Sequence, residues 1–313
     1  MRKKQDYIFL YVKGICMGAA EVIPGVSGST AALLTGIYEE LISSLNSINR
    51  ESIKLLVNKK FNEFWKLING NFLLTVLAGI LTSFLTIARV ILYGLKHNPI
   101  LIGAFFFSLI IMAAPLVMRE EIKKWDSVAI IGFLAAIIIA YALSFLPPFQ
   151  TPRSLWMLFF MGSLAGAIAF IPGISFTFIL IALGQFGFLT SAFAEFNITV
   201  ILIFATGFVS GLIGVSKLLS RFFTKFRRVT IAILTGVMLG FLNKVWPWRE
   251  VLEFVTNRKG EQVPAFDRSI LPWNYFETTG KDPQLFQAIL MMALGVFIVI
   301  LIEKIASRRK TTF

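Results

Sequence analysis

The feature that most constrains this chain is a short motif that occurs twice. Residues 20–30 read Ala-Glu-Val-Ile-Pro-Gly-Val-Ser-Gly-Ser-Thr, and residues 168–178 read Ile-Ala-Phe-Ile-Pro-Gly-Ile-Ser-Phe-Thr-Phe. The flanking glycines repeat at the same offset, since Gly14 corresponds to Gly162. A Pro-Gly pair breaks a helix, and secondary transporters often place their substrate site at broken helices, one from each repeat. We therefore expect a duplicated chain whose two breaks meet near the middle of a membrane.

The composition is that of a membrane protein. Hydrophobic residues make up 57% of the chain, and the mean hydropathy is +0.78. Six apolar segments are long enough to span a bilayer. They are approximately 71–93, 99–118, 127–146, 196–219, 229–246 and 285–303.

The two motif segments, 7–45 and 154–193, are apolar but interrupted near their middle. Each arm is slightly shorter than the hydrocarbon core, so we interpret both segments as re-entrant helical hairpins. A pair of full spans in each segment is the alternative that the sequence leaves open.

The predicted fold class is an all-α polytopic membrane protein with an inverted repeat. The first repeat, 1–150, holds one hairpin, an amphipathic segment at 51–68 and three spans. The second repeat, 151–313, holds the other hairpin, three spans and a long loop at 247–284. Three spans separate the hairpins, which is an odd number, so the hairpins enter from opposite sides. The loops on the N-terminal side carry 19 of the 30 Lys and Arg residues, against eight on the other side, which predicts cytoplasmic N- and C-termini.

The net charge of +13 is explained by these loops and does not indicate a nucleic-acid partner. Cys16 is the single cysteine, which excludes an internal disulfide framework and a cysteine-based metal site. We expect no cofactor and no metal. A homo-oligomer remains open.

Residues 51–68 place Ile53, Val57 and Phe61 at helical spacing, opposed by lysines. Such a basic amphipathic helix lies on the membrane surface, or it packs on the protein as an ordinary cytoplasmic helix. The sequence does not separate these two possibilities.

The motifs carry small and hydroxyl side chains beside backbone N–H groups that a broken helix leaves without helical partners. Such groups need a partner from protein, water or ligand inside a membrane, and with a helix end they suit a phosphate. The alternative is a kink whose hydroxyls bond locally. The candidate substrate-binding residues of the two motifs are Ser27, Gly28, Ser29, Thr30, Ser175 and Thr177.

Arg89 and Lys217 occupy equivalent positions on the span that follows each hairpin. Cations within spans are costly and often mark a functional path. We expect them to bind phosphate, although both also lie near span ends, where long side chains reach the headgroups.

Glu21 lies next to the first motif, and burial favours the neutral form of a carboxyl group. It is a candidate for substrate binding and proton coupling, or else a structural partner for Lys13 or Arg89. The one histidine, His97, lies in a loop, so an acid–base enzyme site is not expected.

At these motifs the chain resembles the bacterial and archaeal polyprenyl-phosphate transporter family. The resembling residues are Lys13-Gly14, Gly18, Glu21 to Thr30, Gly36-Ile37-Tyr38 and Pro172 to Ser175. The resemblance covers nearly the whole chain and implies that undecaprenyl phosphate is carried from the outer to the inner leaflet for cell-wall synthesis. It also implies that paired hairpins hold the headgroup, although Phe176 stands where the first copy has a small residue, Gly28.

The predicted function is therefore an inverted-repeat transporter or flippase for a polyprenyl phosphate in the cell membrane. Its polar cavity would replace the water around the headgroup, while the tail stays in lipid. The alternative from another class is a secondary transporter or channel for a small soluble anion.

Overall fold

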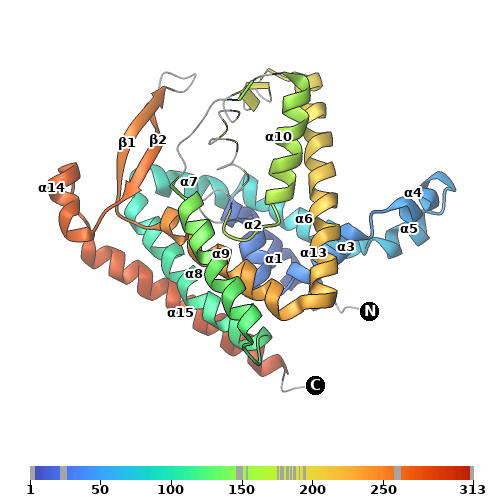
Figure 1. The fold of residues 1–313 in the computed structure, drawn as a ribbon, viewed down its shortest axis with the longest axis horizontal. Coiled ribbons are helices and arrows are strands. Elements are labelled where there is room, and N and C mark those ends of the chain that lie inside the picture. The colour runs from blue at the N-terminus through green and yellow to red at the C-terminus, as the bar shows by residue number, and fades with distance from the viewer. Residues whose placement is uncertain are drawn as a thin grey trace.

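A computed structural model describes most of the chain. It covers residues 4–21, 27–145, 151–152, 154–174, 195–256 and 262–310, with eight single positions between 174 and 195. The elements are α1 (Lys4–Glu21), α2 (Gly28–Leu34), α3 (Tyr38–Asn46), α4 (Arg50–Val57), α5 (Phe61–Leu67), α6 (Gly70–Leu85), α7 (Ile87–His97), α8 (Pro99–Glu121), α9 (Ser127–Leu143), α10 (Leu155–Ile168), α13 (Ile198–Gly240), η1 (Phe241–Val245), β1 (Arg249–Thr256), β2 (Gln262–Ser269), η2 (Pro272–Asn274), α14 (Tyr275–Thr279) and α15 (Leu285–Lys310). Figure 1 shows their arrangement.

The described residues are mainly helical, as expected of an all-α membrane protein, with one exception. The segment 247–284, expected to be a loop, contains an antiparallel hairpin in which Arg249 pairs with Ser269 and Thr256 with Gln262. The strand Arg249–Thr256 contains two valines, a phenylalanine and a threonine, which are residues that favour strands. The segment predicted as a long loop therefore contains a short hairpin, within a chain that is otherwise helical where the structure describes it.

Two described helices are long and apolar enough to cross a membrane: Pro99–Arg119 and Ile198–Val245. A third span is possible if Phe61–Leu67 and Gly70–Leu85, bent by 70°, are taken together. Shorter apolar helices cover Ser127–Leu143, Leu155–Ile168 and Leu285–Leu301.

The expected span 71–93 is not one helix. It divides at Thr86 into α6 and α7, and the Thr86 hydroxyl donates a 2.6 Å hydrogen bond to the Thr82 carbonyl oxygen. Such back-bonding is known to bend helices. Arg89 is consequently on a different helix from Gly79 and Ser83.

The expected spans 196–219 and 229–246 are joined, because α13 runs through the basic segment between them. The junction is a kink at Phe226, whose φ of −135° and ψ of 43° are non-helical. Directly after the kink, Arg227 pairs with Glu39 and Arg228 pairs with Asp126. These ion pairs tie the kink to α3 and to the start of α9.

The amphipathic segment 51–68 was expected to be one helix and is two, α4 and α5. Lys59 adopts a left-handed conformation with φ of 57°. Its amide donates to the Leu56 carbonyl, and the Lys60 amide donates to the Leu55 carbonyl. This pair of bonds is a Schellman motif, which ends a helix.

The first arm of each half packs on the next long helix in the same way. A Cβ on Gly14 would collide with the Val76 backbone, and a Cβ on Gly162 would collide with the Phe204 backbone. Val76 and Phe204 are themselves separated by 128 residues, the spacing that relates Arg89 to Lys217. The pairs α1–α6 and α10–α13 are therefore built on equivalent glycine contacts.

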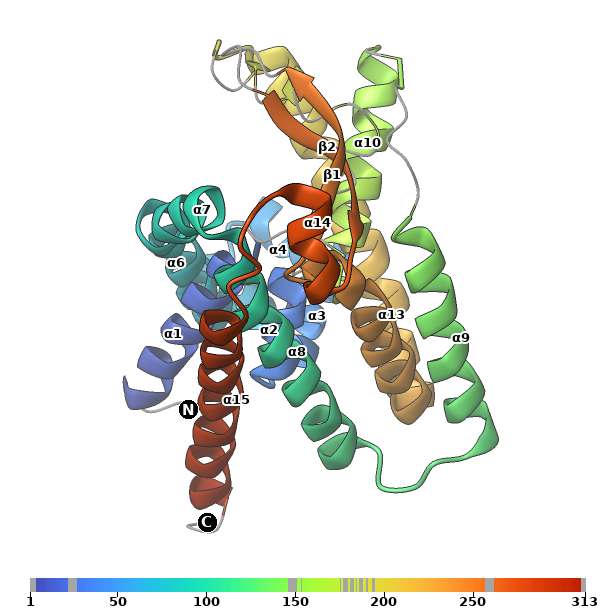
Figure 2. The same ribbon diagram turned by 90° about the vertical axis from the view of Figure 1, so that its left-hand side faces the viewer.

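The remaining helices pack across the two halves. In the first half α8 lies beside α15 of the second half, and Gly295 faces the Phe105 carbonyl and Ser108. In the second half α13 lies beside α9 of the first half, and Gly236 faces the Phe133 carbonyl. Figure 2 shows both pairs. Such reciprocal contacts are the pattern that a two-fold relation produces.

Both views place the N-terminal end of α1 and the C-terminal end of α15 toward one side of the molecule. The β1–β2 hairpin and the beginning of α10 lie at the opposite side. The first arms of the two motif segments, α1 and α10, therefore begin at opposite sides.

Candidate functional site

The hydroxyl side chains of the first motif form a buried cluster at the start of α2. Ser27 is the N-cap, and its Oγ accepts a 3.2 Å hydrogen bond from the Thr30 amide. The same Oγ lies 2.8 Å from Ser29 Oγ and 3.0 Å from Thr30 Oγ1. The exposed fractions of the three residues are 0%, 2% and 1%. We call these three residues the hydroxyl cluster.

Glu21 reaches this cluster from the end of α1. Its Oε2 accepts a 2.7 Å hydrogen bond from the Gly28 amide. A carboxylate bonded to an amide in the first turn of a helix is a favourable contact. Gly28 suits the position, because a Cβ there would lie 3.2 Å from both Glu21 Oε2 and the Met17 carbonyl oxygen.

Three amides at the start of α2 have partners within the protein. Gly28 donates to Glu21, Thr30 donates to Ser27 Oγ, and Ala31 donates to the Ser27 carbonyl oxygen. The sequence left protein, water or ligand as possible partners for these amides. The structure shows that their partners are protein groups. An anion that bound one of these three amides would have to displace its present partner.

The second motif meets the first at this cluster. The Gly173 amide donates a 2.7 Å hydrogen bond to Thr30 Oγ1, across 143 residues of sequence. The Tyr38 hydroxyl, from the start of α3, donates to the Phe170 carbonyl oxygen of the second copy. The two motif copies therefore contact each other through Thr30 and Gly173. Pro24 and Gly25 lie outside the described residues, so a meeting of the two Pro-Gly breaks near the middle of a membrane stays a prediction.

The second break has a conformation that requires glycine. Gly173 has a φ of +90°, where residues with side chains rarely lie. A Cβ there would also lie 2.7 Å from Met238 Cα. The break is therefore held between α2 and the C-terminal part of α13, and we call this contact region the junction.

The structure brings together only part of the predicted site. Glu21 and residues 27–30 are adjacent, whereas Lys217 is exposed on α13 and is not part of the hydroxyl cluster. Arg89 lies on α7, but its side chain is outside the described residues. Ser175 and Thr177 also lie outside them.

Two residues of the junction had no predicted role. Tyr38 belongs to the Gly36-Ile37-Tyr38 part of the resemblance, and Gly173 belongs to the second motif. Their positions in the motifs were the available signal. Their contacts depend on how the halves pack, which the sequence alone does not give.

Two surface pockets lie elsewhere. One of about 380 Å³ is lined by His97, Tyr275 and Lys281, among others. Another of about 260 Å³ lies between α3 and α13, beside Glu39 and Arg227. Neither pocket is lined by the hydroxyl cluster, which is closely packed.

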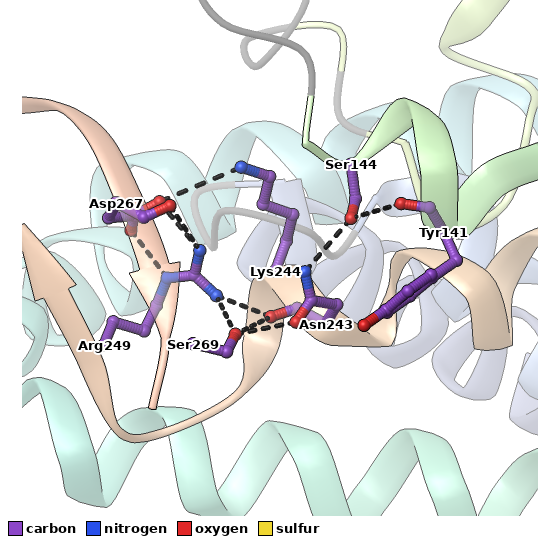
Figure 3. Close-up of polar contacts among 7 residues, drawn as sticks. All are labelled: Tyr141, Ser144, Asn243, Lys244, Arg249, Asp267 and Ser269. Atoms are coloured by element: carbon purple, nitrogen blue, oxygen red, sulfur yellow. Dashed lines mark hydrogen bonds and ion pairs between the residues drawn. The ribbon is translucent and has the colours of Figure 1, made fainter. Parts of the chain in front are cut away.

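A second polar network lies at the base of the β-hairpin (Figure 3). Arg249 binds both carboxylate oxygens of Asp267, at 2.6 Å and 2.8 Å. Ser269 donates to Asn243 Oδ1, and Asn243 Nδ2 donates to Ser144 Oγ at the end of α9. The network therefore ties the hairpin to both halves of the chain.

The charges of this network compensate one another. Burial alone would raise the pKa of Asp267, but hydrogen bonds and charge from Arg249, with the charge of Lys244, hold it below its ordinary value. Asp267 is thus kept ionised beside its two cations. We assign this network a structural role.

Comparison with known proteins identifies the family. Residues 17–263 match the family described as "VCA0040-like: Undecaprenyl phosphate translocase-like". The chain belongs to this family. The resemblance inferred from the motifs is therefore confirmed.

Two proteins similar to this chain carry the name polyprenyl-phosphate transporter. The protein of Vibrio cholerae serotype O1 is 37% identical over 307 residues, which cover 98% of this chain and 99% of that protein. The protein of Staphylococcus aureus is 27% identical over 253 residues, which cover 75% of this chain and 85% of that protein. No solved structure matches the chain.

Proposed function

We propose that this chain translocates a polyprenyl phosphate, undecaprenyl phosphate, across the cell membrane. Its family and the names of its relatives support this function. The observation that carries the proposal at the level of residues is the hydrogen bond between Gly173 and Thr30, which joins the two motif copies inside a buried group of hydroxyls.

The charge of the headgroup is the barrier to translocation. Moving a phosphate into hydrocarbon is very costly, whereas the polyprenyl tail can remain in lipid. A hydroxyl is both donor and acceptor, so Ser27, Ser29 and Thr30, which now bond to one another, can turn to donate to a headgroup. The junction then replaces part of the water around the phosphate.

Glu21 gives this site a means of proton coupling. Its carboxylate accepts the hydrogen bond of the Gly28 amide. It would repel a phosphate that approached the same donor. Protonation of Glu21 removes the repulsion and weakens the acceptor. Headgroup binding and proton uptake by Glu21 would then occur together.

The wider arrangement follows from the same proposal. The chain crosses the membrane several times as an inverted repeat, with both termini in the cytoplasm and 247–284 outside. Support comes from α1 and α10 beginning at opposite sides of the molecule. Alternating exposure of the two re-entrant hairpins moves the headgroup from the outer to the inner leaflet, which recycles the carrier for cell-wall synthesis. Arg89 and Lys217 attract the phosphate, and Ser175 and Thr177 complete its contacts.

Binding of radiolabelled undecaprenyl phosphate to the protein in nanodiscs tests the proposal. We expect saturable binding that excess inorganic phosphate and the uncharged alcohol undecaprenol do not displace. Ser29→Ala should weaken it by about tenfold or more, because hydrogen bonds to charged groups contribute about 1.5–3 kcal/mol. Ser43→Ala, at an exposed serine on α3, is the matched control.

Displacement by inorganic phosphate would instead support a transporter of soluble anions. Equal binding by the Ser29→Ala and Ser43→Ala variants would place the headgroup away from the hydroxyl cluster.

A further inference from the structure

Helices α4 and α5 form an arm that the second half of the chain lacks. Gly14 and Gly162 are 148 positions apart, whereas Arg89 and Lys217 are 128 apart, so the first half has 20 more residues between hairpin and span. Residues 50–67, the α4–α5 arm, account for most of this difference. The arm is therefore a feature of the first half only, in a chain that is otherwise duplicated.

The arm exposes apolar side chains that the protein does not cover. Val57 is 76% exposed, Phe61 61%, Ile53 54% and Trp65 40%. Ile53 and Val57 are four residues apart on α4, and Phe61 and Trp65 are four apart on α5, so each helix carries an exposed apolar stripe. The alternative that this segment packs as an ordinary helix on the protein is not supported by this exposure.

The same arm is basic. Five cations, Arg50, Lys54, Lys59, Lys60 and Lys66, stand against the two carboxylates of Glu51 and Glu63, and all seven residues are exposed. Lys60 pairs with Glu63 at 3.0 Å. This density of charge excludes burial in hydrocarbon and complements an anionic surface.

The arm is capped at its beginning and bonded to the rest of the protein at its end. Asn49 and Ser52 form a capping box at the start of α4. At the other end Trp65 donates to Asn71, and Asn69 donates to Glu40 on α3, each at 2.8 Å. The C-terminal end of the arm is therefore bonded to the start of α6, and the residue that joins α5 to α6 is bonded to α3.

The base of the arm lies near the basic segment in the middle of α13. Asn46, the last residue of α3, donates a 3.2 Å hydrogen bond to Ser220, which is six residues before the kink at Phe226. The charged segment around this kink pairs with α3 and α9. The arm and these cations belong to the same end of the molecule.

We propose that the α4–α5 arm docks on the anionic lipid headgroups of the membrane surface. The apolar stripes enter the boundary between headgroups and acyl chains, and the cations bind the lipid phosphates. The arm thereby holds the first hairpin against one leaflet, a feature that the second hairpin lacks. The inference requires a membrane protein but does not depend on which lipid is carried.

A fluorescence experiment on the full chain in proteoliposomes tests the proposal. In a Cys16→Ser background, Val57→Cys is labelled with the environment-sensitive dye NBD. In vesicles that contain phosphatidylglycerol we expect blue-shifted emission that is quenched by nitroxides near the headgroups. The shift and the quenching should be smaller in pure phosphatidylcholine vesicles. Glu51→Cys, on the same helix, is the matched control and should keep water-like emission.

The charge requirement has its own test. Replacing Lys54, Lys59, Lys60 and Lys66 together by Gln should remove the dependence of the Val57 signal on phosphatidylglycerol. Salt near 1 M should do the same, since the Debye length is then about 3 Å. Water-like emission from Val57 in both lipid mixtures, equal to that from Glu51, would overturn the proposal whether or not the protein transports lipid.

Discussion

Replacing Thr30 by Val tests the contact that joins the two halves. Valine has nearly the shape of threonine, so the change removes the Oγ1 that accepts the Gly173 amide at 2.7 Å and leaves little cavity. Gly173 is buried, and a buried donor without a partner costs about 1–3 kcal/mol. The 3.0 Å contact with Ser27 Oγ is lost as well.

Hydrogen–deuterium exchange measures this cost at the amide concerned. A loss of about 1–3 kcal/mol corresponds to about 5- to 150-fold faster exchange of the Gly173 amide, if exchange follows local opening. Peptides that contain Gly173 should show this acceleration, whereas peptides from the arm should not.

Thr206→Val is the matched control. The Thr206 hydroxyl is exposed and donates to the Leu202 carbonyl of its own helix, so its removal leaves no buried donor without a partner. Unchanged exchange at Gly173 in the Thr30→Val variant would refute the junction as described. Equal acceleration by both variants would show that the effect is global.

Three further changes test the packing, the coupling and the hairpin. Gly211→Ala should lower the free energy of unfolding of the detergent-solubilised protein by about 1–3 kcal/mol, measured by thermal unfolding. The reason is that a Cβ on Gly211 would collide with the Ser163 carbonyl oxygen of α10. Gly214→Ala, which has open space, should be neutral or slightly stabilising, and equal effects would contradict the glycine contact. Glu21→Gln should abolish the pH dependence of transport, unlike Glu51→Gln on the arm, and a retained dependence would exclude Glu21 as the coupling group. Folding lowers the pKa of Asp267. Its contribution to the free energy of unfolding is therefore present at neutral pH and is lost as the pH falls below about 4. Asp267→Asn should therefore flatten the melting temperature between about pH 6 and pH 3, and an unchanged acid profile would contradict the network's role.

That the two motif copies contact each other was predictable because the motif is duplicated. The contacts that form the junction were not. Glu21 was identified by its position beside the motif. Its hydrogen bond to Gly28 depends on where the end of α1 lies relative to the start of α2. Tyr38 and Phe170 are 132 residues apart, and only the packing of the halves brings them together.

The differences in the helices have local causes that hydropathy does not detect. Lys59 ends α4 with a positive φ, although lysine carries no signal for that conformation. Thr86 divides an apolar segment that reads as one span, and α13 continues through a basic segment that reads as a loop. The span prediction rested on apolar content alone. Apolar content shows neither the division at Thr86 nor the continuation of α13.

Transfer of undecaprenyl phosphate between leaflets is the direct test of the proposed function. Radiolabelled lipid is reconstituted with the protein in sealed vesicles, and a phosphatase that cannot cross the membrane is added outside, with and without an imposed pH gradient. With the protein present, we expect hydrolysis to continue beyond the fraction released from protein-free vesicles, because inner-leaflet lipid is carried outward. The Ser43→Ala variant should behave as wild type, and Ser29→Ala should slow the additional release. An identical released fraction with and without the protein, under both conditions, would contradict translocation of this lipid.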